Sequence, residues 1–190
     1  METAERLFAD KGYDGTSVRD IADEAEVNVA MISYYFGSRE KLLESLFTYR
    51  SEASLMKVES MLGNKEVTTL QKVNMLIDYY IDRIQSQPCF HRIMMREQVT
   101  NFRTTTAGMI SEFKRKNQSL VEQLIHEGQK KGEFKKNIEV PLMMATLIAR
   151  FLILLLHNII LEKSIIFKPL LTKILISNEK ETRYLLKKII

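Results

Sequence analysis

The sequence predicts an all-α fold with about nine helices, on three observations. Apolar residues recur three and four positions apart along most of the chain, which places them on one face of a helix. The 190 residues contain only 7 Gly and 3 Pro and few runs in which β-branched and polar residues alternate, so little favours strands. The breaks in the apolar pattern also fall at residues that cap or end helices.

Three short helices are expected at the N-terminal end. The first ends at Gly12, the second begins at Thr16 and Ser17, whose hydroxyls can cap its first amides, and the third is capped by Asn28. Their buried stripes consist of Ala4, Leu7, Phe8, Val18, Ile21, Ala22, Ala25, Ile32 and Phe36. Two short helices joined by a turn of about three or four residues indicate a helix-turn-helix, although an ordinary helical hairpin has the same pattern.

Longer helices follow this motif. The apolar pattern predicts helices over residues 38–63, 67–85, 90–99, 105–129, 141–161 and 168–190. Pro88 is expected to close the 67–85 helix, because proline cannot continue the hydrogen-bond ladder. Asn137 is expected to cap the helix that follows it, with Pro141 in the first turn.

The segment 142–161 is almost continuously apolar and would be long enough to cross a bilayer. Arg150 near its middle would cost about 3 kcal/mol in a membrane, and His157 and Asn158 add to that cost. Burial against a partner subunit is therefore favoured over a membrane span. A two-fold interface is expected from residues of the last two helices: Leu152, Leu155, Ile159, Leu171, Ile174, Tyr184 and Leu185.

The charge distribution does not by itself favour nucleic acid. The chain has a net charge of +4, but residues 1–50 contain six Lys or Arg against ten Asp or Glu. The helix-turn-helix segment is therefore the acidic part of the chain. Any DNA binding must depend on where individual donors are placed, with the acids turned away from phosphate.

The sequence LFADKGYDGTSVRDIADEAEVNVAMISYYFGSREKLL resembles the DNA-binding domain of the TetR family of bacterial regulators, over residues 4 to about 46. The shared features are the KGY end of the first helix, the TS start of the second, and the aromatic end of the third. The chain departs from the family pattern at Glu26 and Ala30, where glycine is common, at Ser33, where tyrosine is common, and at Arg39, where lysine is usual. Relatives usually have more helix and a basic arm before this start, so we expect a naturally short or trimmed N-terminus.

The resemblance implies a DNA-binding domain over residues 1–46 and a helical effector-binding and dimerisation domain over 47–190. It implies a homodimeric, sequence-specific regulator, most simply a repressor that a small-molecule effector releases from a palindromic double-stranded DNA operator. The positions that relatives use for phosphate are Thr16, Asn28, Tyr34, Tyr35 and Arg39, and Ser17 is grouped with them. Val29, Ala30, Met31 and Ser33 face the base edges, where Val29 or Met31 can meet a thymine methyl. Instead of contacting phosphate, Tyr35 could pack beneath Phe36 in the core.

Glu26 is the unusual residue of the predicted turn. If this position requires a positive φ, a residue other than glycine costs about 1 to 2 kcal/mol.

The effector pocket is placed by the resemblance in the second domain. The chain has 10 Met, and several of them fall on the helices expected there, where thioether side chains fill irregular apolar volumes. The candidate lining residues are Tyr80, His91, Met94, Met95, Met109, Phe113 and Arg150. Each methionine is equally explained as an ordinary core residue.

Enzymatic and metal-binding functions are not favoured. His91, His126 and His157 are far apart, Cys89 and His91 alone are too few for zinc, and no glycine-rich phosphate loop is present. We expect no cofactor, no metal and no catalytic residue. A single cysteine and the lack of a secretion signal favour a cytoplasmic protein. The remaining alternative is a helical protein-interaction or membrane-associated module that does not bind DNA.

Overall fold

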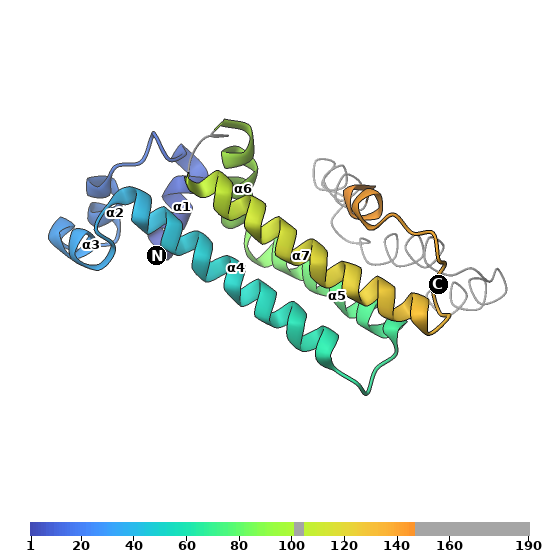
Figure 1. Ribbon diagram of the computed structural model, residues 1–190. Coiled ribbons are helices and arrows are strands. Elements are labelled where there is room, and N and C mark those ends of the chain that lie inside the picture. The colour runs from blue at the N-terminus through green and yellow to red at the C-terminus, as the bar shows by residue number, and fades with distance from the viewer. Residues whose placement is uncertain (101–104, 147–190) are drawn as a thin grey trace. The chain divides into compact units, whose positions relative to one another are not determined.

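The computed structural model describes residues 1–100 and 105–146, and in this part of the chain all regular structure is helical (Figure 1). The helices are α1 (Glu2–Lys11), α2 (Val18–Glu24), α3 (Val29–Phe36), α4 (Arg39–Gly63), α5 (Thr69–Ser86), α6 (Pro88–Thr100) and α7 (Thr105–Lys130). A further helix begins at Val140 and is described as far as Thr146. The all-α prediction is confirmed. The expected helix over 168–190, most of the 141–161 helix, and all seven predicted dimer residues lie outside the described residues.

Helix α5 ends at Ser86, just before Pro88, as predicted. Pro88 is also the first residue of α6, two positions before the predicted start, where its missing amide hydrogen leaves no bond unmade. The predicted cap of the helix after α7 is wrong. Asn137 does not cap the helix after α7, because that helix begins at Val140 and the amide of Met143 donates to the carbonyl of Glu139 at 2.9 Å.

The chain divides into two compact units. The first unit consists of Met1–Lys57 and Ile84–Lys116, and the second of Val58–Arg83 and Asn117–Ile190. The first unit thus extends past the motif that ends near residue 46 and includes α6 and the first part of α7.

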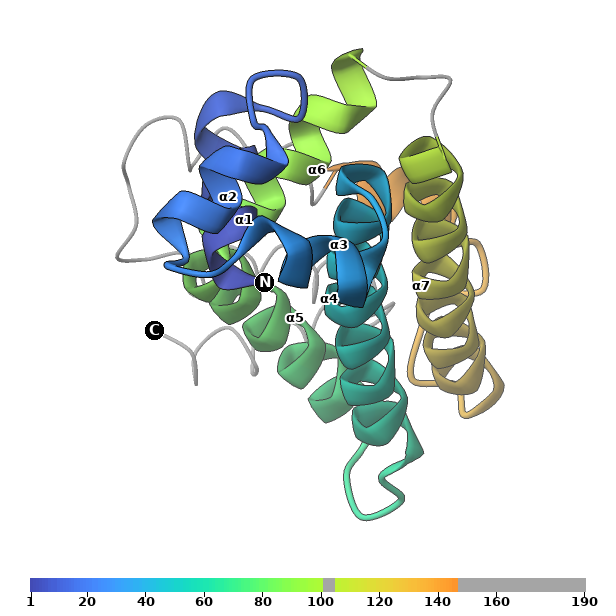
Figure 2. The same cartoon turned by 90° about the vertical axis from the view of Figure 1, so that its left-hand side faces the viewer.

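A single core of apolar side chains joins the helices of the first unit. Helix α6 packs against α1 (Figure 2), and the rings of Phe47 and Phe90 have centroids 5.3 Å apart. The most deeply buried residues of this core are Ala4, Leu7, Phe8, Ile21, Ala22, Leu42, Leu43, Leu46, Phe47, Phe90, Ile93 and Ile110. The helix-turn-helix therefore packs against α4, α6 and α7, since each of these helices contributes side chains to the same core.

The extra helices change the charge balance of the unit that carries the motif. Residues 1–57 have seven Lys or Arg and eleven Asp or Glu, whereas residues 84–116 have six and two, so the unit has no net charge. Several acids of the motif are also engaged in ion pairs: Glu5 with Arg50, Glu24 with Arg6, and Asp10 with Arg92. The acidic surplus in residues 1–50 is thus largely compensated within the unit.

In the second unit, α5 and α7 are joined by polar contacts. The ammonium of the buried Lys72 donates to the carboxylate of Glu127 at 3.2 Å, and the ammonium of Lys131 donates to the same carboxylate at 2.6 Å. Hydrogen bonding to Lys131 lowers the pKa of Glu127. Among the described helices, none is long and apolar enough to span a bilayer; of the apolar segment 142–161, only residues up to Thr146 are described.

Candidate nucleic-acid interface

Helix α2 begins with a reciprocal pair of hydrogen bonds. The amide of Asp20 donates to the Ser17 hydroxyl at 3.1 Å, and the amide of Ser17 donates to the Asp20 carboxylate at 2.7 Å. These bonds satisfy amides that a helix start leaves without partners. The Ser17 hydroxyl also lowers the pKa of Asp20. Ser17 is therefore the cap of α2, as predicted, and the start of this helix is fixed locally.

The turn between α2 and α3 has the hydrogen bonding of a Schellman motif. The amide of Val27 donates to the carbonyl of Ala22 at 3.0 Å, and the amide of Glu26 donates to that of Asp23 at 3.3 Å. Glu26 occupies the left-handed position of this motif, with a φ of 54°. This is the one positive φ of a non-glycine residue in the described part of the chain. The turn thus imposes on Glu26 a conformation that favours glycine.

Replacing Glu26 with glycine should raise the free energy of unfolding by about 0.5 to 1 kcal/mol. Relief of the left-handed strain outweighs the greater freedom that glycine gives the unfolded chain. Urea unfolding followed by circular dichroism measures the change. Glu26→Ala is the matched control, because it removes the carboxylate but keeps the Cβ, and it should bring no gain. A glycine variant less stable than the wild type would contradict this account.

Helix α3 has one buried face and one exposed face. Ile32 is buried, and Val29 and Phe36 pack against the core of the first unit. The exposed face consists of Ala30, Met31, Ser33, Tyr34 and Tyr35. Tyr34 is 84% exposed and Tyr35 is 69% exposed, and their rings meet edge to face at 5.1 Å. The alternative core position of Tyr35 is therefore wrong, and both phenols are available to a partner molecule.

The prediction for Thr16 is wrong. Thr16 is fully buried, and its hydroxyl donates to the carbonyl of Gly12 at 2.7 Å and lies 3.2 Å from that of Leu7. The side chain holds the loop between α1 and α2 against the end of α1, so it can neither cap α2 nor reach a phosphate. Asn28 caps α3 as predicted, since its side-chain oxygen accepts the amide of Ala30 at 2.8 Å.

Arg39 lies at the start of α4 with its guanidinium engaged inside the unit. It donates to the carbonyl of Thr16 at 2.6 Å and lies 4.0 Å from the centre of the Tyr13 ring. This arrangement connects α4 to the loop before α2. Helical periodicity could not indicate this contact, because Tyr13 and Arg39 are far apart in the sequence.

Replacing Arg39 with alanine should have two effects. It should weaken binding to all duplexes alike and lower the slope of log affinity against log salt by about one, as expected for one lost phosphate contact. It should also lower the stability by about 1 to 2 kcal/mol, because the Thr16 carbonyl loses a charged donor. Fluorescence anisotropy at several salt concentrations and a thermal melt measure the two effects. Arg39→Lys is the control, because it keeps the positive charge. If Arg39→Ala has the salt slope of the wild type, Arg39 does not contact a phosphate and has only a structural role.

The candidate effector residues do not come together at one cavity of the described residues. Met94 and Met109 pack against the core of the first unit and Met95 is exposed. Tyr80, in the second unit, donates to the side-chain oxygen of Asn117 at 2.6 Å, and burial raises the pKa of Tyr80 to about 12. His91 and Phe113 are half-buried in the first unit, and Arg150 lies outside the described residues.

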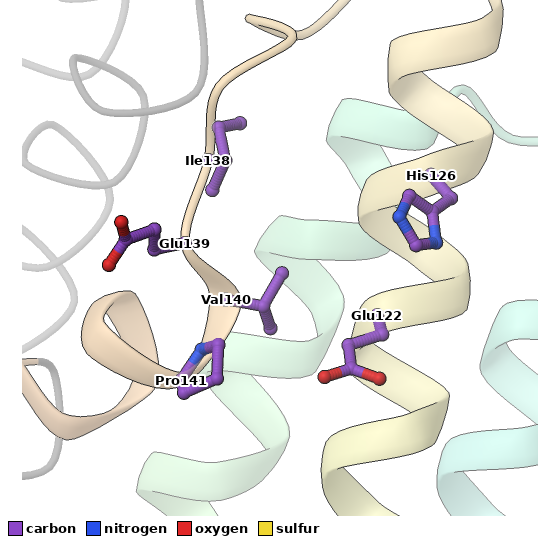
Figure 3. Close-up of a pocket in the computed structure, with 6 residues that line it drawn as sticks. All are labelled: Glu122, His126, Ile138, Glu139, Val140 and Pro141. Carbon is purple, nitrogen blue, oxygen red and sulfur yellow. The ribbon is translucent and has the colours of Figure 1, made fainter.

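Each unit has a shallow hollow on its surface. The hollow in the second unit, about 380 Å³, is lined by Glu122, His126, Ile138, Glu139, Val140 and Pro141 (Figure 3). The hollow in the first unit, about 390 Å³, is lined by six residues of α4 together with Met109. Of the six candidates that fall among the described residues, Met109 is the one that lines either of these two hollows. Over residues 1–100 and 105–146 there is no group of three or more side chains placed to hold a metal ion.

Taken together, a capped α2, a tight turn and an α3 with one exposed face define a helix-turn-helix protein. The family described as "Bacterial regulatory proteins, tetR family" matches residues 1–46. Residues 1–46 of this chain are thus similar to the TetR family of bacterial regulators.

Two curated relatives and one solved structure illustrate the similarity. The probable HTH-type transcriptional regulator YttP of Bacillus subtilis is 34% identical over 137 residues, which are 70% of this chain and 65% of YttP. The chain thus spans slightly less than two thirds of the length of that relative. The HTH-type transcriptional repressor NicS of Pseudomonas putida is 27% identical over 77% of this chain and 71% of its own length. The crystal structure of the transcriptional regulator FadR from Bacillus subtilis, in complex with stearoyl-CoA, has a TM-score of 0.70 at 21% identity, covering 93% of this chain and 95% of FadR.

Proposed function

We propose that this protein is a sequence-specific DNA-binding transcriptional regulator, and most directly a repressor. The observation that carries the proposal is the exposed face of α3, where two tyrosines and Met31 extend from a helix whose other face is fixed in the core. In a helix-turn-helix this second helix enters the major groove. The similarity to YttP, a probable regulator, and to NicS, a repressor, supports the proposal. We propose no enzymatic activity.

Residues 1–46 are proposed as the DNA-binding part and residues 47–190 as the effector-binding and dimerisation part. The proposed DNA contacts are Ser17, Asn28, Val29, Ala30, Met31, Ser33, Tyr34, Tyr35 and Arg39, without Thr16. The site of action is the cytoplasm, where the DNA of a bacterium lies.

We propose a homodimer, because the sequences of residues 142–161 and 168–190 contain more apolar side chains than one chain of this size can bury. Two α3 helices related by a two-fold axis would then read a palindromic operator. Sedimentation of the wild type should give the mass of a dimer. Arg150→Glu or Tyr184→Ala should lower that mass, and a monomeric wild type would contradict the proposal.

A small-molecule effector is proposed for the second part of the chain. FadR has been crystallised with stearoyl-CoA, so a protein of this fold can hold a small molecule. A thermal-shift screen against hydrophobic acids, acyl thioesters, antibiotics and dyes would find candidates. A true effector should also release the protein from DNA at the concentration that stabilises it.

The direct test of DNA binding is a gel-shift against the DNA upstream of the protein's own gene, with random duplex as competitor. A regulator should bind this DNA in the presence of excess competitor and should protect a palindromic segment from cleavage. A helical interaction module without DNA-binding function should show no preference for any duplex. Equal binding to upstream and random DNA would contradict the proposed function.

A further inference from the structure

The exposed face of α3 carries neither a charge nor a side-chain amide. Its members are Ala30, Met31, Ser33, Tyr34 and Tyr35. In the major groove, guanine is read best by two donors from Arg or Lys, and adenine by the donor and acceptor of Asn or Gln. None of these side chains belongs to the exposed face of α3, so the helix itself has no group for either contact.

The nearby polar side chains that could make such contacts are engaged in the fold. Asn28 uses its side-chain oxygen to cap α3 at 2.8 Å, so the acceptor that paired reading of adenine requires is already engaged at the first turn of the helix. Arg39 lies outside α3 with its guanidinium held by the carbonyl of Thr16, and its proposed DNA contact is a phosphate, not a base. Lys41 donates to Glu44 at 2.7 Å. Arg19 lies on α2, the helix that crosses the sugar-phosphate backbone in this motif.

The groups left on α3 are methyl, thioether and hydroxyl groups. Hydroxyls both donate and accept, so Ser33 and the tyrosines discriminate poorly between bases. Thymine is the one standard base with an apolar group, its C5-methyl, in the major groove. Met31 is 47% exposed and unbranched, so it can adapt to that methyl. Val29 is half-buried against the core and Ala30 is short, so neither reaches as far.

We infer that the protein reads its operator mainly through thymine methyl groups in the major groove, and that Met31 is the side chain that contacts them. This inference rests on the proposed function and specifies the class of DNA that the same surface takes. An operator half-site should present thymine methyls where α3 enters the groove. Exchange of a contacted thymine for uracil, which lacks only the methyl, should weaken binding although base pairing is unchanged.

The test begins with selection of bound duplexes from a random library by the full chain. Each thymine of the selected duplex is then replaced singly by deoxyuridine (dU), and affinity is measured by fluorescence anisotropy. At least one dU in each half-site should weaken binding by about four-fold, the effect of one buried methyl-sized group. If no dU changes the affinity by more than about two-fold, the inference is overturned. If no duplex is enriched at all, the proposed function fails as well.

Met31 is assigned by combining a variant with the dU duplex. Met31→Ala should weaken binding to the thymine duplex by about four-fold or more and should bind the thymine and dU duplexes alike. Met56→Ala is the matched control, because Met56 is 61% exposed on α4 and should leave both affinities unchanged. Equal melting temperatures for both variants exclude misfolding. If Met31→Ala still distinguishes thymine from dU, Met31 is not the contact and the assignment is overturned.

Discussion

Replacing Glu5 with alanine should lower the free energy of unfolding by about 2 to 3 kcal/mol. Glu5 lies on α1, its side chain is only 6% exposed, and its carboxylate accepts two bonds from the Arg50 guanidinium on α4, at 2.6 and 3.1 Å. Removal of one partner of a buried pair leaves the other charge poorly solvated. Arg50 is partly exposed, so the cost should fall below that of a fully buried pair. Urea unfolding followed by circular dichroism measures the difference.

The matched control is Glu24→Ala. Glu24 pairs with Arg6 between α2 and α1, but both side chains are more than two-fifths exposed. Exposed pairs contribute less than about 1 kcal/mol. If the two variants lose the same stability, the Glu5–Arg50 pair does not join α1 to α4 as the structure indicates.

Replacing Gly128 with alanine should destabilise the protein by about 1 to 3 kcal/mol, although alanine is the better helix former. A Cβ on Gly128 would overlap the ring of Phe134, and Phe134 is itself buried. The same chain segment is fixed by the amides of Glu133 and Phe134, which donate to the Gly128 carbonyl at 2.9 and 3.2 Å. These bonds hold the backbone of Phe134 close to α7, so a Cβ at position 128 must displace the buried ring.

Gly108→Ala in the same helix is the control. No atom lies within 4 Å of a Cβ built on Gly108, so this variant should gain up to about 1 kcal/mol from helix propensity. Thermal unfolding should shift in opposite directions for the two glycines. A rise in both melting temperatures would contradict the packing of Phe134 on α7.

The helix starts and the turn were predictable because their determinants are local. Ser17 and Asn28 cap the helices that follow them, and Glu26 has the positive φ that its place in the turn indicated. Pro88 shows the limit of this reasoning, since a proline disfavours continuation of one helix and also suits the first turn of the next.

The long-range partners were not predictable. Periodicity shows that a face is buried but not which helix covers it, so Phe90 and Ile93 of α6 did not appear as parts of the motif's core. Thr16 has a side chain suited to phosphate, yet its hydroxyl is used by backbone carbonyls that come near only in the folded unit. The methionine candidates for an effector pocket stay a prediction, because a thioether packs equally well in a core and in a pocket.

The exposed face of α3 is proposed to bind a specific DNA sequence. The decisive measurement is the affinity of Tyr34→Ala for the selected duplex, compared with Tyr49→Ala, which removes a tyrosine 57% exposed on α4. Loss of Tyr34 should weaken binding by about ten-fold or more, as for one good contact at the interface, and loss of Tyr49 by less than about two-fold. Wild-type affinity in Tyr34→Ala, with the fold intact, would contradict the claim.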